Sequence, residues 1–214
     1  MRLTVKICGV RSPEVVETAV VGGARAIGLV FYPKSPRAVG PMAAAQLSRL
    51  TPMTVRVVGL FVDPADEDLG EIIERVPLDM LQLHGAETPE RVAAIREAYG
   101  VPVMKAIRVA DATDLDRAMS YESVADWLLF DAKPPANVAA LPGGTGLAFD
   151  WSLLAGRSWS VPWMLAGGLR AETLGEAVRV TGAAAVDVSS GVESRPGVKD
   201  PSLIWSFLDT ARNL

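Results

Sequence analysis

Cysteine and histidine are almost missing from this sequence. Its 214 residues include one of each. A single thiol cannot form a disulfide within the chain, and it excludes zinc sites built from several cysteines. One imidazole is likewise too few for a site built on histidines. We therefore expect no metal.

Positive charge is also scarce. Lysine and arginine number 21 against 25 aspartates and glutamates, which gives a net charge of −4. A nucleic-acid-binding surface would need a basic face, so we expect no nucleic-acid partner. A pocket for an anionic ligand stays open, because net charge says little about a single cleft.

Long apolar segments are missing as well. No stretch approaches the roughly 18 uncharged apolar residues that a membrane-spanning helix needs. Charged residues interrupt the N-terminus before the apolar core of a signal peptide could form. We expect no membrane partner and a cytoplasmic location, where the thiol stays reduced.

The sequence does contain many short apolar runs. Half of its residues are hydrophobic and 21% are charged, which excludes a disordered chain. Apolar runs without strict alternation are typical of strands that are buried on both faces of a parallel sheet. We predict eight strands: Leu3–Cys8, Ala26–Phe31, Val55–Val62, Met80–Leu83, Val103–Ile107, Trp127–Phe130, Trp163–Ala166 and Ala183–Val188.

Segments of helical character follow most of these runs. The first begins with Ser12, Pro13 and Glu14, the order of a helix cap, a first-turn proline and a first-turn acid. The predicted helices are Ser12–Val21, Met42–Leu50, Glu67–Arg75, Arg91–Tyr99, Thr113–Met119, Asp150–Leu154, Ala171–Val180 and Pro201–Arg212. Eight nearly equal strand–helix units predict a single-domain (β/α)8 TIM barrel over residues 1–214. The alternative is an open doubly wound sheet, which is disfavoured because no GxGxxG follows the first strand.

In such a barrel the active site lies at the carboxyl ends of the strands. Cys8 and Asp131 end the first and sixth predicted strands, which face each other across an eight-stranded ring. A thiolate at Cys8 could act as a base or nucleophile, and Lys6, on the same face of its strand, would favour the thiolate. A desolvated Asp131 could act as a general acid. The alternatives are a buried core residue for Cys8, and a helix cap or an ion pair with Lys133 for Asp131.

Three more polar residues follow predicted strands. Arg37 lies in a proline-stiffened loop and could bind a substrate carboxylate through two hydrogen bonds, or it could be an ordinary surface cation. His84 could donate to a substrate oxygen, although a lone histidine is more often a structural hydrogen-bonding group. Asp187 follows an apolar run, where an unpaired acid would be costly, so we expect it to face a substrate or join a polar network.

Small residues fill the loops after strands seven and eight, which are the usual phosphate site of this fold. One loop has Gly167 and Gly168, and the other has Ser189, Ser190 and Gly191. Glycines let backbone N–H groups approach an anion, so we predict phosphate binding here, with simple turn glycines as the alternative. The glycine-rich residues 142–146 could form a lid or only a flexible loop.

In their order along the chain, these residues resemble the phosphoribosylanthranilate isomerase family of tryptophan biosynthesis, from the first strand to the last helix. The sequence differs from the family's common pattern at Arg11, where threonine is usual, and at Arg170, where asparagine is usual. The markers of the resemblance are Lys6-Ile7-Cys8-Gly9, Gly28-Leu29-Val30-Phe31, Ser35-Pro36-Arg37, Val58-Gly59-Leu60-Phe61-Val62, Leu81-Gln82-Leu83-His84-Gly85, Phe130-Asp131, Gly143-Gly144-Thr145-Gly146, Phe149-Asp150-Trp151, Leu165-Ala166-Gly167-Gly168-Leu169 and Val186-Asp187-Val188-Ser189-Ser190-Gly191-Val192-Glu193.

The resemblance implies an Amadori rearrangement of N-(5-phosphoribosyl)anthranilate to 1-(2-carboxyphenylamino)-1-deoxyribulose 5-phosphate. Asp131 would protonate the furanose ring oxygen to open the sugar, and Cys8 would remove the C2′ proton of the resulting Schiff base. Arg37 would face the anthranilate carboxylate, and the two small-residue loops would hold the phosphate. The scheme needs no metal and no organic cofactor. The expected partner is a small phosphosugar substrate, bound by a monomer or a homodimer.

Other functions compete with this interpretation. Indole-glycerol-phosphate synthase is a neighbouring phosphosugar barrel, but it would need a catalytic lysine at the rim and a longer N-terminal extension. The aminoaldose isomerase of histidine biosynthesis uses an acid where this chain has Cys8. A non-catalytic binder of phosphorylated ligands would keep the barrel and lose turnover.

Overall fold

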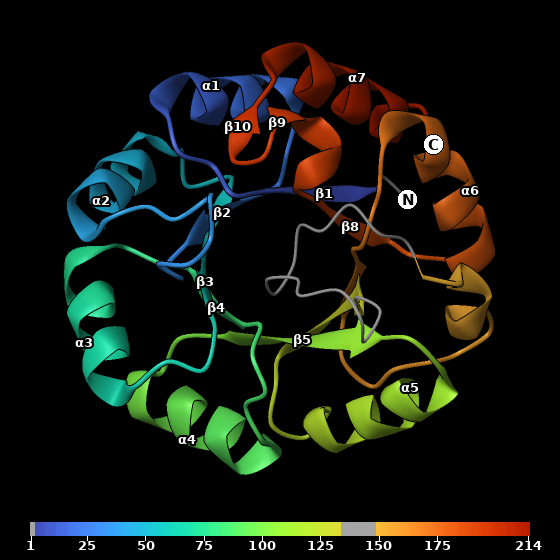
Figure 1. The fold of residues 1–214 in the computed structure, drawn as a ribbon, viewed down its shortest axis with the longest axis horizontal. Helices are drawn as coiled ribbons and strands as arrows, with labels where there is room; N and C mark the ends of the chain where they lie inside the picture. Colours follow the sequence, from blue (N-terminus) through green and yellow to red (C-terminus); the bar gives the residue numbers. More distant parts are fainter. Residues whose placement is uncertain (1–2, 134–148) are drawn as a thin grey trace.

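Eight parallel strands close into one barrel, and helices surround it (Figure 1). The computed structural model describes residues 3–133 and 149–214. Neighbouring strands pair in chain order, and the last strand pairs with the first. The predicted barrel is therefore confirmed, and the open-sheet alternative is wrong. The strands are β1 (Thr4–Cys8), β2 (Ala26–Val30), β3 (Arg56–Phe61), β4 (Met80–Leu83), β5 (Val103–Val109), β6 (Trp127–Ala132), β7 (Trp163–Leu165) and β8 (Ala185–Val188).

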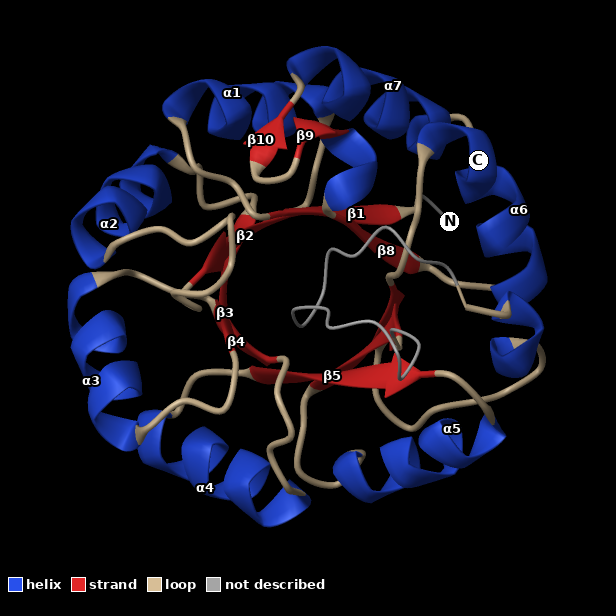
Figure 2. Cartoon of the chain, viewed as in Figure 1, coloured by secondary structure: helices blue, strands red, loops and turns tan. Residues whose placement is uncertain are grey.

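The helices form the outer ring that covers the barrel (Figure 2). Their starts follow the local chemistry of the sequence: the Ser12 side chain accepts from the backbone N–H of Val15, and a proline lies in the first turn of the first helix. No helix among the described residues is long and apolar enough to cross a membrane. The helices are α1 (Pro13–Gly22), α2 (Pro41–Leu50), α3 (Asp66–Arg75), α4 (Pro89–Tyr99), α5 (Ala112–Ala118), α6 (Ala171–Thr181) and α7 (Pro201–Arg212).

Two parts of the secondary structure differ from the sequence-based prediction. The helix predicted at Asp150–Leu154 is a single 3₁₀ turn, η2 (Trp151–Leu154), which stops just before Gly156 with its φ of 70°. Four residues are too few for a regular α-helix. A short antiparallel hairpin, β9 (Glu193–Arg195) with β10 (Val198–Lys199), follows β8 and was not predicted. Two- and three-residue strands leave no readable pattern of alternation.

The barrel wall separates two hydrophobic layers. Side chains such as Leu81 and Phe130 point outward and pack with the helices in the larger core. Inside the barrel, methionines and small residues, including Met80, Met104 and Met164, fill the end where the strands begin. Because side chains on a strand alternate, Gln82 follows Met80 on the inner face of β4, and His84, directly after the strand, continues that face. The interior therefore changes from apolar to polar toward the carboxyl ends of the strands.

Shortening a buried side chain in the outer core should destabilise the protein. Leu81 is fully buried, so we expect Leu81→Ala to lower the free energy of unfolding by about 2–5 kcal/mol, because the substitution leaves a cavity. Denaturant-induced unfolding followed by circular dichroism measures the change. Met42→Ala is the matched control, because Met42 is 83% exposed and a surface change stays within about 0.5 kcal/mol. Equal destabilisation by both substitutions would contradict this view of the core.

Candidate active site

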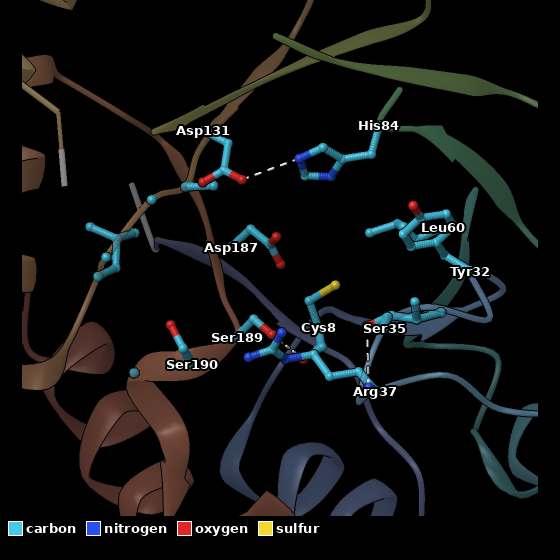
Figure 3. Close-up of a pocket in the computed structure, with 16 residues that line it drawn as sticks. Cys8, Tyr32, Ser35, Arg37, Leu60, His84, Asp131, Asp187, Ser189 and Ser190 are labelled. Atoms are coloured by element: carbon cyan, nitrogen blue, oxygen red, sulfur yellow. Dashed lines mark hydrogen bonds and ion pairs between the residues drawn. The ribbon is translucent and has the colours of Figure 1, made fainter. Parts of the chain in front are cut away.

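A cavity opens at the carboxyl end of the barrel (Figure 3). Val30, Tyr32 and Leu60 also line it, although their sequence positions did not predict a place in the site. They are ordinary strand and loop residues by sequence, and only the closed barrel turns them toward the cavity. All ten residues that were selected from the sequence line this cavity: Cys8, Arg37, His84, Asp131, Gly167, Gly168, Asp187, Ser189, Ser190 and Gly191.

Cys8 and Asp131 enter the cavity from opposite parts of the ring. Cys8 is the last residue of β1, and Asp131 lies one residue before the end of β6. The two strands are three steps apart in the barrel order, as predicted. Both residues are buried, with 4% and 6% of their surface exposed. A ligand in the cavity would therefore meet both groups away from bulk water.

A buried ion pair lies beneath Cys8. The Lys6 Nζ is 2.9 Å from Asp187 Oδ1, and the two residues are register partners on β1 and β8. Burial by itself would lower the pKa of Lys6, but the Asp187 carboxylate and the Cys8 thiol outweigh it, so the pKa is raised. Lys6 is therefore held as an ammonium that neutralises Asp187. Asp187 thus joins a polar network while it also lines the cavity.

The thiol of Cys8 is held in its neutral form. Burial raises its pKa, and the nearby Asp187 carboxylate adds to that effect. The positive charges of Lys6 and Lys199 act in the opposite direction but do not compensate. Lys6 favours the thiolate, as expected, but the cost of burying an anion is larger here, so the net pKa of Cys8 is raised.

His84 links Asp131 to the barrel interior. Its Nε2 lies 3.2 Å from Asp131 Oδ2, and its Nδ1 lies 3.0 Å from Gln82 Nε2. Both ring nitrogens are thus engaged within the protein, so a direct bond from His84 to a substrate would require one of them to be released. The alternative pairing of Asp131 with Lys133 is wrong, because Lys133 binds Asp114 at 3.1 Å.

Arg37 is not an ordinary surface cation. Its Nε and one terminal nitrogen bind the two carboxylate oxygens of Glu193 at 2.8 and 2.7 Å. Lys199 Nζ lies 2.7 Å from the same carboxylate. Burial opposes the charge on Glu193, but these two cations outweigh it and hold the pKa of that carboxyl below its usual value. Two cations and one anion leave a net positive charge beside the cavity.

The β9–β10 hairpin connects this charge cluster to the predicted phosphate loop. Lys199 Nζ donates to the Ser189 carbonyl at 2.9 Å, and Ser189 Oγ donates to the Cys8 carbonyl at 3.1 Å. Arg11, at the position where the sequence differs from the family pattern, donates to the carbonyl of Pro36. No pattern in the sequence pointed to Lys199, because only the hairpin brings it to Glu193 and Ser189.

The two small-residue loops have the geometry of an anion site. Gly167 and Gly168 have φ values of 84° and 65°, which favour glycine. At Gly191, a Cβ atom would collide with the carbonyl oxygen of Leu169. Within the described part of the chain, the backbone N–H groups of Gly167, Gly168, Ser190 and Gly191 donate no hydrogen bond. The predicted lid, residues 142–146, lies outside the described residues.

The chain is similar to known proteins over its whole length. The sequence profile of the family described as "N-(5'phosphoribosyl)anthranilate (PRA) isomerase" matches residues 5–210. A relative named N-(5'-phosphoribosyl)anthranilate isomerase, from Rhodospirillum centenum, is 63% identical over 214 residues, which is 100% of both chains.

Solved structures agree with the sequence comparison. Phosphoribosyl anthranilate isomerase from Thermotoga maritima is 38% identical, with a TM-score of 0.88 over 99% of this chain and 100% of that chain. Another structure, 35% identical with a TM-score of 0.83 over 99% and 100% of the two chains, is described as this isomerase in complex with reduced 1-(o-carboxyphenylamino)-1-deoxyribulose 5-phosphate.

The raised pKa of Cys8 can be tested directly, because it is the single thiol of the chain. Burial favours the neutral form, so thiolate absorbance near 240 nm should appear at higher pH in the folded protein than in the urea-unfolded protein. A Cys8→Ser variant, titrated in parallel, supplies the tyrosinate background. Thiolate formation at equal or lower pH in the folded protein would contradict the burial argument.

Proposed function

The chain belongs to the N-(5'-phosphoribosyl)anthranilate isomerase family, and from this premise we propose how its barrel mouth performs the reaction. The substrate is N-(5-phosphoribosyl)anthranilate, and the reaction is its isomerisation to 1-(2-carboxyphenylamino)-1-deoxyribulose 5-phosphate, a step of tryptophan biosynthesis. The observation that carries the mechanism is the placement of Cys8 and Asp131 on opposite sides of one buried cavity.

Asp131 acts first, as the general acid. It donates a proton to the furanose ring oxygen, the C1′–O bond breaks, and the anthranilate nitrogen becomes the nitrogen of a protonated Schiff base. The low exposure of Asp131 supports this role, because a proton held away from water passes to the substrate and not to solvent.

Cys8 acts second, as the general base. It removes the proton from C2′, and the electron pair moves into the C1′–C2′ bond and neutralises the iminium nitrogen. The enolamine then tautomerises to the ketone. In the absence of substrate, burial keeps the thiol neutral. A cationic Schiff base beside Cys8 favours the thiolate and acidifies the C2′ proton. The thiol therefore releases its own proton to water at the cavity mouth before its sulfur takes the proton from C2′.

The remaining predicted residues bind the ends of the substrate. The N–H groups of Gly167, Gly168, Ser190 and Gly191 hold the phosphate, and Ser189 fixes the start of their second loop by donating its hydroxyl to the Cys8 carbonyl. Arg37, oriented by Glu193, faces the carboxylate of the anthranilate ring. Tight binding of the remote phosphate helps to position the reacting carbons.

We place the enzyme in the cytoplasm, acting on a small phosphosugar without a nucleic-acid partner. The single buried thiol and the acidic net charge support these assignments. We expect a monomer or a homodimer.

Loss of the acid or of the base should abolish turnover. Cys8→Ala and Asp131→Ala should each lower kcat by at least ~10²-fold, the lower end of what a positioned acid or base contributes. The assay generates the substrate in situ and follows the loss of anthranilate fluorescence, with Met42→Ala as the exposed control. A folded wild-type protein that binds a product analogue without turnover would instead support the non-catalytic binder.

The phosphate loop can be tested by one added methyl group. We expect Gly191→Ala to raise KM about tenfold, equivalent to one lost charge-assisted hydrogen bond of about 1.5 kcal/mol. The affinity for inorganic phosphate, measured as a competitive inhibitor, should fall in parallel. Gly175→Ala in α6 is the matched control, because its Cβ would meet only Leu214 at 3.5 Å, an ordinary contact. An unchanged KM in Gly191→Ala would reject this phosphate site.

A further inference from the structure

Gln82 is a polar residue in the interior of the barrel that the mechanism above does not use. It lies on the inner face of β4 and is fully buried. Its register partner on β5 is the apolar Met104. The one hydrogen bond that its side chain makes among the described residues joins Nε2 to Nδ1 of His84, at 3.0 Å, while Oε1 has no partner there. A buried amide with one unpaired polar atom lowers the stability of the fold. The presence of Gln82 here therefore calls for an explanation, and its contact with His84 is the place to look for one.

With the amide nitrogen of Gln82 turned toward the ring, this contact selects which nitrogen of His84 carries the proton. An amide nitrogen is a donor only, so Nδ1 of the neutral ring must accept and must be bare. The single ring proton then resides on Nε2, which faces Asp131 Oδ2 at 3.2 Å. In the opposite tautomer, the lone pair of Nε2 would face the carboxyl group instead.

The two tautomers have opposite effects on a general acid at Asp131. When Nε2 donates to Oδ2, the carboxyl proton is left on Oδ1, which also accepts from the Ala132 backbone N–H at 2.9 Å. After that proton passes to the sugar, the carboxylate keeps both donors. If Nε2 were bare, it would accept the carboxyl proton itself and compete with the substrate for it.

We propose that Gln82 is a positioning residue that fixes the Nε2–H tautomer of His84 and so keeps the proton of Asp131 available to the substrate. The inference rests on the proposed role of Asp131 as the acid. Gln82 lies behind His84 as seen from the cavity, since it does not line the cavity while His84 does. Its effect on the reaction therefore passes through the imidazole ring.

The chain offers an unusually clean test, because it has one histidine. In protein labelled with ¹⁵N-histidine, the ring signals at pH 8 belong to His84 alone, and their chemical shifts identify the protonated nitrogen. We expect a neutral ring protonated at Nε2 in the wild type. In Gln82→Met, which keeps the length of the side chain but removes the donor, we expect a clear fraction of the Nδ1–H form.

Turnover should follow the tautomer. We expect kcat of Gln82→Met to fall about tenfold, a part of the ~10²–10⁴ that a positioned acid contributes, with KM changed less than twofold. Gln82→Glu, which offers acceptors alone, should draw the ring proton to Nδ1 and lower kcat further. Met104→Leu, an apolar exchange at the register partner of Gln82 that removes no hydrogen-bonding group, should alter neither the tautomer nor kcat.

Three results would overturn the inference: a wild-type ring protonated at Nδ1 or at both nitrogens, a Gln82→Met variant that keeps the Nε2–H form, or a tautomer change without a fall in kcat. If Gln82→Met does not fold, Gln82→Glu answers the same question. A folded wild type without turnover would instead reject the proposed function, while the ¹⁵N spectrum would still report the tautomer.

Discussion

The pairing of β1 with β8 is the contact on which the whole site depends. It closes the barrel, and at its centre the buried Lys6 ammonium meets the Asp187 carboxylate. Removing one partner of such a pair costs about 3–5 kcal/mol, because the other charge stays buried and uncompensated. The same pairing brings Cys8 beside the loop that follows β8, where Ser189 donates to its carbonyl. Without closure, Cys8 and the loop Ser189–Gly191 would have no common cavity.

Burial is the second constraint on this site, and it explains why its polar residues occur in networks. Gln82 contacts His84, which in turn contacts Asp131. Lys6 forms an ion pair with Asp187, and Glu193 forms ion pairs with both Arg37 and Lys199. Each buried charge thus has a partner, as the cost of desolvation requires. Cys8 is the exception, since the surrounding cations do not offset its burial and its proton stays in place. The proposed acid and the proposed base therefore differ in their surroundings: Asp131 makes hydrogen bonds to His84 and Ala132, whereas burial dominates the environment of Cys8.

Much of the fold and of the site could be predicted because both arise from local, repeated patterns. Each strand, turn and helix of the barrel is a contiguous segment, and the observed strand ends lie within two residues of those predicted, for example Val109 against the predicted Ile107. Because all strands of this fold end at one rim, the selected residues could be assigned to a single site from the sequence alone. The 3₁₀ turn η2 and the β9–β10 hairpin escaped prediction because segments of two to four residues carry too little pattern.

The sequence by itself determined the strand–helix order, the barrel, and the residues that surround its mouth, because those depend on neighbours along the chain. Only the tertiary structure decided how these residues are charged and paired. Lys6 and Asp187 are 181 residues apart, and Arg37 and Glu193 are 156 apart. The raised pKa of Cys8 likewise depends on charged groups from β8 and from the β9–β10 hairpin, and on the exclusion of water. Electrostatic interactions act through space and strengthen with burial, so these properties exist only once distant segments have packed together.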